Sequence, residues 1–370
     1  MSFNKNGWRE LDFNVDDVVI SQIRERLMAY SDEIRPYQGI FSGKGIVFCA
    51  GGLGYFSCVW ISICKLRGLG CSLPIEVWYL GTEFSEEVID QLEKFNVKCH
   101  NFLDHKEYKQ YNIHSFGLKP LAILLSQFEE VMFLDADNLA IADPSYLFED
   151  ENYKMYGTIF WPDMWRTSPD NPIWKITDCQ DYAKNEQESG QLLINKKMCW
   201  EELNLCLYLN IQKNIYYRFL YGDKDTFKFA WLARKKKYYM IDGFPGVCGY
   251  DKDGVFLGNT LVQHTPSGRA LFFHRNLLKW DVTLTNECVW SRVKRFRSVT
   301  ENSSFTFSFS SESHFYLDIN GDIEELDVDQ IIPGIEAECM DILLQLRSEK
   351  FYLDFVHHTH LRINRFKNSW

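Results

Sequence analysis

Two aspartates separated by one small residue offer the clearest chemistry in this chain, since Asp135 and Asp137 flank Ala136. They follow residues 131–134, whose wholly apolar run predicts a short buried strand. A compact turn after such a strand could direct both carboxylates at one hard divalent cation such as Mn or Mg. A cation in this position would stabilise the charge that a leaving diphosphate gains when a sugar is transferred from a nucleotide diphosphate. An isolated Asp-x-Asp is more often a simple turn than a metal site. The segments around it must therefore show which of the two it is.

The segments before these aspartates alternate between short apolar strands and helices. Residues 45–49 predict a buried strand, and the glycine turn after it leads into a helix over residues 56–66. The alternation continues with strands at 74–80, 97–102 and 131–134 and helices at 84–95 and 118–128. This pattern is typical of an α/β domain on a mostly parallel sheet. In such sheets ligands bind beyond the carboxyl ends of the strands, where Asp135 and Asp137 are expected to lie.

The flanking segments differ in pattern from this α/β region. Apolar residues at near-helical spacing predict an amphipathic helix within residues 15–30. Residues 162–185 are rich in Pro, Asp, Asn and Trp and predict loops over the site, whereas phenylalanines alternating with Thr and Ser from Phe305 to Phe309 predict a half-buried strand, and residues 334–350 a helix. We therefore predict an N-terminal helical extension over 1–40, a catalytic domain over 41–300 and a C-terminal appendage over 301–370.

The overall composition describes a globular protein. Of 370 residues, 46% are hydrophobic and 25% charged, and the net charge of -11 argues against nucleic acid as the main partner because phosphate binding needs a basic surface. No stretch reaches the roughly 18 to 20 apolar residues of a membrane span, so we expect no transmembrane segment in the given chain. Eleven cysteines are scattered singly, which predicts neither a zinc site nor a disulfide framework and favours a reducing compartment.

Several further segments stand in an order that resembles a known family. They are Pro-Ile-Glu-Val-Trp-Tyr at 74–79, Lys-Pro-Leu-Ala at 119–122, Phe-Glu-Glu-Val-Met-Phe-Leu-Asp-Ala-Asp-Asn at 128–138, Asp-Pro at 143–144, Leu-Phe at 147–148, Phe-Trp-Pro-Asp at 160–163, Glu-Ser-Gly-Gln at 188–191 and Gly-Asp-Lys-Asp-Thr-Phe at 222–227. Together they cover roughly residues 45–280. This ordered set resembles the fungal-type Golgi α-mannosyltransferases, glycosyltransferase family 71.

The resemblance implies a GT-A fold, in which a Rossmann-like mixed sheet flanked by helices carries an Asp-x-Asp metal site. It further implies retaining transfer of α-mannose from GDP-mannose, with Mn or Mg, to a hydroxyl of a glycan or glycoprotein acceptor. Two alternatives stay open: a UDP-hexose donor, and a catalytically inactive GT-A-fold binding protein. Family members are usually anchored in the Golgi, so the chain could be a luminal domain without its anchor, or a soluble enzyme that is cytoplasmic or delivered into a host.

A third metal ligand is expected from a histidine late in the domain. His274 is the best match, because its spacing to Lys279 is similar to that in related GT-A enzymes, where the histidine binds metal and the lysine meets the diphosphate. His264 is the competitor, and either histidine could instead bond locally to the backbone.

Other residues are candidates for holding the donor. Gly51 and Gly52 stand where a nucleotide must approach the backbone closely, and Tyr55 could lie against the base. Lys119 opens the helix before the Asp-x-Asp strand and could contact donor phosphate or ribose, although a surface lysine is the alternative. Such a glycine turn also has purely structural uses, and no dinucleotide or ATP motif accompanies it.

Four polar residues in apolar settings are the catalytic candidates. In the resembling family, the segments that hold Glu188, Gln191, Asp223 and Asp225 line the sugar and acceptor side of the cleft. Retaining transfer needs no dedicated protein base, because the donor phosphate can accept the acceptor's proton. If the reaction inverted the anomeric centre, Asp223 or Asp225 would be the candidate base.

Two residues are candidates for the acceptor platform. Trp161 offers a ring for stacking and Asp163 a carboxylate for sugar hydroxyls, or both could simply hold a loop in place. The cluster of His357, His358 and His360 is assigned no metal role, because adjacent histidines without an acidic partner are more often solvated.

Overall fold

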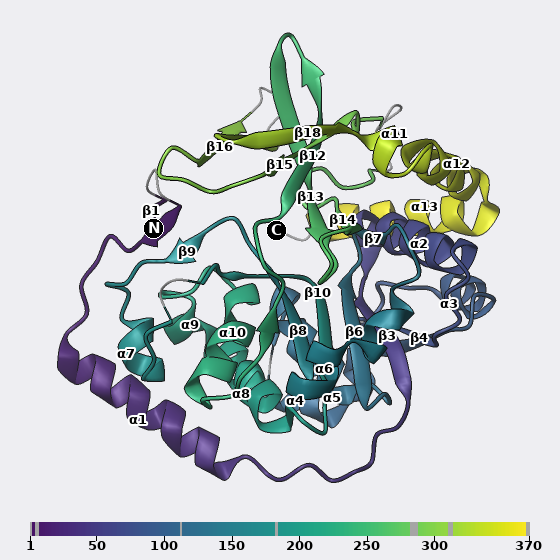
Figure 1. The fold of residues 1–370 in the computed structure, drawn as a ribbon. Helices are drawn as coiled ribbons and strands as arrows, with labels where there is room; N and C mark the ends of the chain where they lie inside the picture. The colour runs from purple at the N-terminus through teal and green to yellow at the C-terminus, as the bar shows by residue number, and fades with distance from the viewer. Residues whose placement is uncertain are drawn as a thin grey trace.

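A seven-stranded mixed sheet lies at the centre of the protein (Figure 1). The computed structural model describes residues 2–3, 7–111, 113–181, 184–281, 288–309 and 314–367. Strands β6, β3, β4 and β5 are parallel, and β10 lies antiparallel between β6 and β8. The sheet has the order β11 (Tyr239–Met240), β8 (Thr158–Pro162), β10 (Gln187–Asn195), β6 (Glu130–Asp135), β3 (Lys44–Cys49), β4 (Ile75–Tyr79) and β5 (Val97–Asn101). The predicted strands of the α/β region are confirmed.

Alternate residues of these strands point into two cores, one on each face of the sheet. On β3, Ile46 and Phe48 pack into one core and Val47 into the other, as the two-residue period of a strand requires. The first core holds residues of α2 (Gly52–Gly68), α3 (Glu86–Glu93), α12 (Ile335–Ser348) and α13 (Lys350–Lys367), and the second those of α1 (Asp17–Glu33), α5 (Leu118–Leu125), α8 (Trp200–Ile211) and α10 (Lys224–Ala233). Helices therefore cover both faces, and the predicted α/β class, a mixed sheet flanked by helices, is confirmed.

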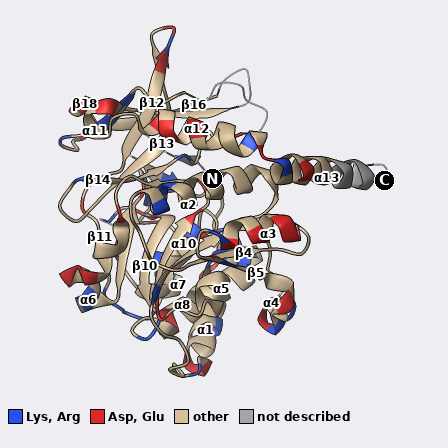
Figure 2. Ribbon diagram, turned by 90° about the vertical axis from the view of Figure 1, so that its right-hand side faces the viewer, with Lys and Arg blue, Asp and Glu red and all other residues tan. Residues whose placement is uncertain are grey.

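A second, antiparallel sheet stands above the first (Figure 1). Figure 2 shows the β12–β13 hairpin projecting beyond both sheets. The sheet runs in the order β16 (Ser304–Phe309), β17 (Phe315–Asn320), β13 (Val255–His264), β12 (Gly246–Lys252), β15 (Arg292–Phe296) and β18 (Ile323–Asp327), with β14 (Ala270–His274) joining β13 to β7 (Asn138–Ala140). Strands that precede and strands that follow residue 300 thus belong to one sheet. The domain boundary that we predicted at residue 300 stays a prediction.

The remaining elements are short. They are β1 (Ser2–Phe3), β2 (Trp8–Glu10), β9 (Arg166–Thr167), α4 (Lys106–Tyr111), α6 (Glu151–Tyr156), α7 (Ile173–Thr177), α9 (Lys213–Tyr216), α11 (Val328–Ile331) and the 3-10 helices η1 (Phe102–Asp104), η2 (Ser115–Gly117) and η3 (Pro144–Glu149). Parallel pairing of β2 with β9 brings the N-terminal segment to the region that we predicted as loops over the site. Among the described residues, no helix has both the length and the apolarity needed to cross a membrane.

The predicted strand at Phe305–Phe309 forms, but its burial differs from the expectation. Phe305 is half-buried, whereas Phe307 and Phe309 are 41% and 60% exposed. The alternation of Phe with Thr and Ser predicted a strand with one apolar face. It could not show that only the Phe305 end of this face is covered by other parts of the protein.

Gly258 lets β13 and β17 approach each other. A Cβ at this position would overlap the carbonyl oxygen of Leu317, its partner across the ladder. We expect Gly258→Ala to lower the free energy of unfolding by about 1 to 3 kcal/mol, as overpacking does, measured by urea denaturation. Gly68→Ala is the matched control: nothing lies within 4 Å of its added Cβ and Gly68 is helical, so stability should stay equal or rise. Equal losses in the two variants would contradict this account.

Candidate active site

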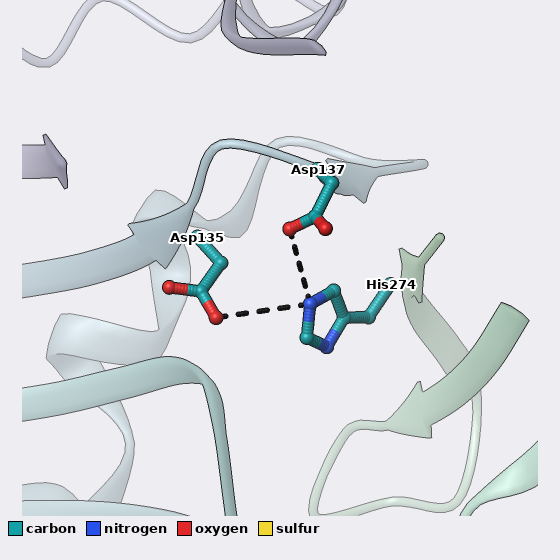
Figure 3. A group of neighbouring side chains, drawn as sticks. All are labelled: Asp135, Asp137 and His274. Carbon is teal, nitrogen blue, oxygen red and sulfur yellow. Dashed lines mark hydrogen bonds and ion pairs between the residues drawn. The ribbon is translucent and has the colours of Figure 1, made fainter. Parts of the chain in front are cut away.

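Pairing within the second sheet positions the predicted metal ligands. Asp135 ends β6, and Asp137 directly precedes β7. Strand β7 pairs with β14 so that Asn138 faces His274, and the Arg275 N–H donates to the carbonyl of Asp137 at 2.9 Å. His274 is thereby carried to the two aspartates across 137 residues of chain (Figure 3).

The geometry of this cluster suits a divalent cation. His274 Nε2 lies 3.1 Å from Asp137 Oδ1 and 3.7 Å from Asp135 Oδ2, as the dashed lines of Figure 3 mark. One ligand atom from each residue falls within 4.8 Å of the others. Two carboxylate oxygens and an imidazole nitrogen form a donor set that accepts Mn, and in part Mg. Among the described residues, these three form the group whose ligand atoms lie close enough together to hold one cation. Neither His264 nor the histidines of α13 belong to this group.

Glu188 fixes the orientation of His274. Its Oε1 lies 3.0 Å from His274 Nδ1, and the carboxylate also accepts from the Gly190 N–H and from Gln191 Nε2, both at 2.7 Å. A carboxylate on Nδ1 leaves Nε2 directed at the aspartates, an arrangement that recurs around metal-binding histidines. Burial disfavours the imidazolium, but Glu188 and Asp137 more than offset it and raise the pKa of His274 to about 10.

Gly190 and Asn138 also shape the site, although the sequence reasoning gave them no role. A Cβ on Gly190 would overlap the imidazole of His274, so this position in β10 must lack a side chain. Asn138 Nδ2 donates to the Gly190 carbonyl at 2.7 Å and to Gln191 Oε1 at 2.8 Å, which ties β7 to β10. A glycine inside a strand often marks such a close approach and was the available signal.

Two lysines face the aspartate pair. Buried Lys119 lies 2.8 Å from Asp135 Oδ2, 3.1 Å from Ser189 Oγ and 3.4 Å from Asp223 Oδ2. Lys279 forms an ion pair with Asp137, and its Nζ lies 5.4 Å from the centre of the Tyr55 ring. Two carboxylates and two ammonium groups therefore lie close together at this point of the site.

A cavity of about 760 Å³ opens over this cluster. Its lining includes most of the predicted site residues: Gly51, Tyr55, Lys119, Asp135, Asp137, Asp163, Glu188, Asp223, His274 and Lys279. The structure brings these together from nearly the whole of the predicted catalytic domain. Their individual roles stay predictions.

Other predicted residues lie outside the lining. Fully buried Asp225 accepts from Arg9 Nη1 at 2.5 Å, which anchors β2, and Trp161 is buried with its Nε1 donating to the His264 carbonyl at 2.8 Å. Gln191 supports Glu188, and Gly52 has a φ of 66°, a left-handed conformation at the start of α2. Burial lowers the pKa of half-buried His264 to about 4.

The cavity also contains residues that the sequence reasoning did not single out. Lys224 Nζ lies 2.7 Å from Asp163 Oδ2 and 3.8 Å from the centre of the Trp165 ring. Burial raises the pKa of Asp163 to about 6 although Lys224 opposes the rise. From the C-terminal sheet, Phe307 and Phe315 reach the same cavity. No local signal in the sequence connects those strands to the aspartates.

Comparison with known proteins identifies one family. The model of the family described as "Mannosyltransferase putative" matches residues 43–186 and 173–264, more than half of the chain. Similar curated proteins include alpha-1,2-mannosyltransferases of Candida albicans, one 30% identical over 62% of this chain and 44% of its own length and another 26% identical over 60% and 46%. One from Saccharomyces cerevisiae is 28% identical over 68% of this chain and 55% of its own length. The chain spans about half the length of these relatives.

Solved structures show weaker similarity. The mannosyltransferase Ktr4p from Saccharomyces cerevisiae overlays on 60% of this chain and 77% of its own, with 13% identity and a TM-score of 0.33. Mouse xyloside xylosyltransferase 1 overlays on 54% of this chain and 86% of its own, with 15% identity and a TM-score of 0.38. Both overlays are weak.

Cation binding at the cluster should depend on pH. Because the pKa of His274 is raised to about 10 in the metal-free protein, its imidazole is protonated at neutral pH and must lose that proton when a cation binds. The apparent affinity for Mn should therefore rise by about tenfold per pH unit between pH 6 and 8. Calorimetry in buffers of different ionisation enthalpy would measure the released proton. Glu188→Gln should lower the pKa of His274 and flatten the dependence. A pH-independent affinity in the wild-type protein would show that His274 loses no proton when the cation binds.

Asp223 and Asp225 should separate function from stability. Asp225→Asn leaves the buried Arg9 guanidinium without a counter-charge and should lower the free energy of unfolding by about 3 to 5 kcal/mol. Asp223→Asn leaves Lys119 paired with Asp135 and should cost about 1 kcal/mol or less. Thermal unfolding followed by circular dichroism compares the two. Equal destabilisation would mean that Asp223 is also a structural anchor.

Proposed function

Because this chain belongs to the mannosyltransferase family whose model covers residues 43–186 and 173–264, we propose that it transfers mannose from GDP-mannose to a hydroxyl of a glycan or glycoprotein. The curated relatives carry the name alpha-1,2-mannosyltransferase, so we extend the proposal to formation of an α-1,2 linkage. The convergence of Asp135, Asp137 and His274 at the floor of one cavity is the observation that supports it most.

The charge of the cavity floor supports a role for a bound cation. Asp135, Asp137, Glu188 and Asp223 contribute four carboxylates there, against Lys119, Lys279 and His274. An anionic diphosphate would add to the negative side, so a divalent cation is needed for it to bind closely. When bound by Asp135, Asp137 and His274, Mn or Mg would stabilise the charge that develops on the departing GDP.

The protein's own groups bind and orient the substrates in this proposal. Lys279, whose side chain is 35% exposed, is placed to contact a diphosphate oxygen, and Lys119 holds Asp135 in its orientation. In the same cavity, Asp163 and Lys224 offer one acceptor and one donor group to sugar hydroxyls. These contacts bring the acceptor hydroxyl and the anomeric carbon together, which lowers the entropic cost of the reaction.

The proposed chemistry retains the anomeric configuration. The acceptor oxygen forms a bond to mannose C1, the bond from C1 to the diphosphate oxygen breaks, and GDP departs with the bonding electrons. The acceptor's proton passes to a donor phosphate oxygen, so that no carboxylate of the chain is needed as base or nucleophile. Glu188 in particular is committed to His274 Nδ1 by a 3.0 Å contact.

Nucleotide release tests this function. We expect the protein with Mn to release GDP from GDP-mannose when a mannose-terminated oligosaccharide is present, and to release little nucleotide from UDP-glucose, UDP-galactose or UDP-N-acetylglucosamine. Asp137→Ala should abolish Mn-dependent release, because it removes one ligand and the partner of Lys279, while the protein stays folded by circular dichroism.

Each other outcome is informative. Turnover of a UDP-hexose but not of GDP-mannose would replace the donor in this proposal. Binding of nucleotide without turnover of any donor would favour an inactive binding protein. Unchanged turnover in Asp137→Ala would show that the cation binds elsewhere.

A further inference from the structure

The β16–β17 hairpin has one wholly apolar face. On β16 this face carries Phe305, Phe307 and Phe309, and the antiparallel register places Ile319, Leu317 and Phe315 opposite them. The other face of β16 carries Ser304, Thr306 and Ser308. The hairpin thus has the alternation of a strand pair that covers something apolar.

The protein itself covers only part of this face. Ile319 and Leu317 are buried in a small core with Met164 and Trp165. Farther along the same face, Phe307 is 41% exposed, Phe315 55% and Phe309 60%. Large aromatic side chains that emerge side by side from a core leave an apolar surface that is characteristic of binding sites.

This exposed surface is continuous with the candidate active site. Phe307, Phe315 and Leu317 line the same cavity as Asp135 and Asp137. The C-terminal sheet therefore forms a wall of that cavity.

A second aromatic wall belongs to the catalytic region. Trp165 and Tyr221 also line the cavity, with ring centres 5.4 Å apart and planes at 80°, and Tyr221 is 50% exposed. Lys224 lies over the Trp165 ring and forms an ion pair with Asp163, so a buried carboxylate and a half-buried lysine accompany these rings. Apolar walls with a few fixed polar groups are what a small-molecule site needs to bind and orient its ligand.

We propose that Phe307 and Phe315, with Trp165 and Tyr221, form a subsite for an acceptor of several linked sugars. The inference rests on the proposed function and extends it from one acceptor hydroxyl to an oligosaccharide. Sugar rings combine C–H faces, which pack on aromatic rings, with hydroxyls, which suit Lys224 and Asp163. A purely apolar ligand would offer no hydrogen-bonding group to Lys224 and Asp163, whereas a glycan offers hydroxyls. The polar pair therefore favours a glycan.

Acceptor length tests the inference. With GDP-mannose held saturating, Phe307→Ala and Phe315→Ala should each raise the KM for α-linked mannotriose by about tenfold, the loss of one stacking contact, and change kcat little. The KM for methyl α-mannoside, which has a single sugar ring, should change much less. Hydrolysis of GDP-mannose without acceptor should stay unchanged. Tyr146→Ala is the control, since Tyr146, at 43%, is about as exposed as Phe307, at 41%, and does not line the cavity.

Direct binding separates this inference from the proposed function. Calorimetric titration with mannotriose needs no turnover, and Phe307→Ala and Phe315→Ala should weaken binding about tenfold by the same stacking argument. If wild-type protein turns over no donor but binds mannotriose through these rings, the proposed function fails and the subsite stands. If donor is turned over while both variants match wild type for mannotriose in KM and affinity, the subsite is refuted; an effect confined to glycopeptide acceptors would also refute it and assign the surface to peptide.

Discussion

Compensation of buried charge is the constraint on which this structure depends. Carboxylates withdrawn from water are stable only when cations and hydrogen-bond donors surround them. Lys119 bridges Asp135 and Asp223, and His274 bridges Asp137 and Glu188. Except for the pair Lys119–Asp135, each of these contacts joins segments distant in the chain. The charged groups therefore hold the cavity floor together.

The backbone makes this arrangement possible. The ladder between β7 and β14 sets His274 beside Asp137, and the missing side chain at Gly190 leaves space for the imidazole. The second sheet is thus more than an addition to the first, because it supplies a candidate metal ligand through β14 and an aromatic wall through β16 and β17. Strand β14 precedes residue 300 in the chain, whereas β16 and β17 follow it.

Local pattern was enough to predict the parallel half of the central sheet and the place of Asp135 and Asp137 on it. Apolar runs of strand length and helical periodicity depend on near neighbours, which a sequence displays directly. The choice of His274 over His264 came from resemblance and stays a prediction; the strand register does set His274 beside Asp137. The family resemblance itself is confirmed by the match over residues 43–186 and 173–264.

What the sequence could not show are contacts that arise only when distant segments meet. Asp225 looks like Asp223 in the sequence, yet one is fully buried against Arg9 and the other lines the cavity. Trp161 and Trp165 differ in the same way, with Trp165 on the cavity and Trp161 behind it. Four residues or fewer separate the members of each pair, so only the packing of remote strands distinguishes them.

Anomalous X-ray scattering from crystals grown with Mn and GDP would test the central claim most directly. The account predicts one strong manganese peak between the carboxylates of Asp135 and Asp137 and the imidazole of His274, with the diphosphate beside it and near Lys279. A manganese peak elsewhere in the cavity, or bound GDP with no peak at these three residues, would contradict it.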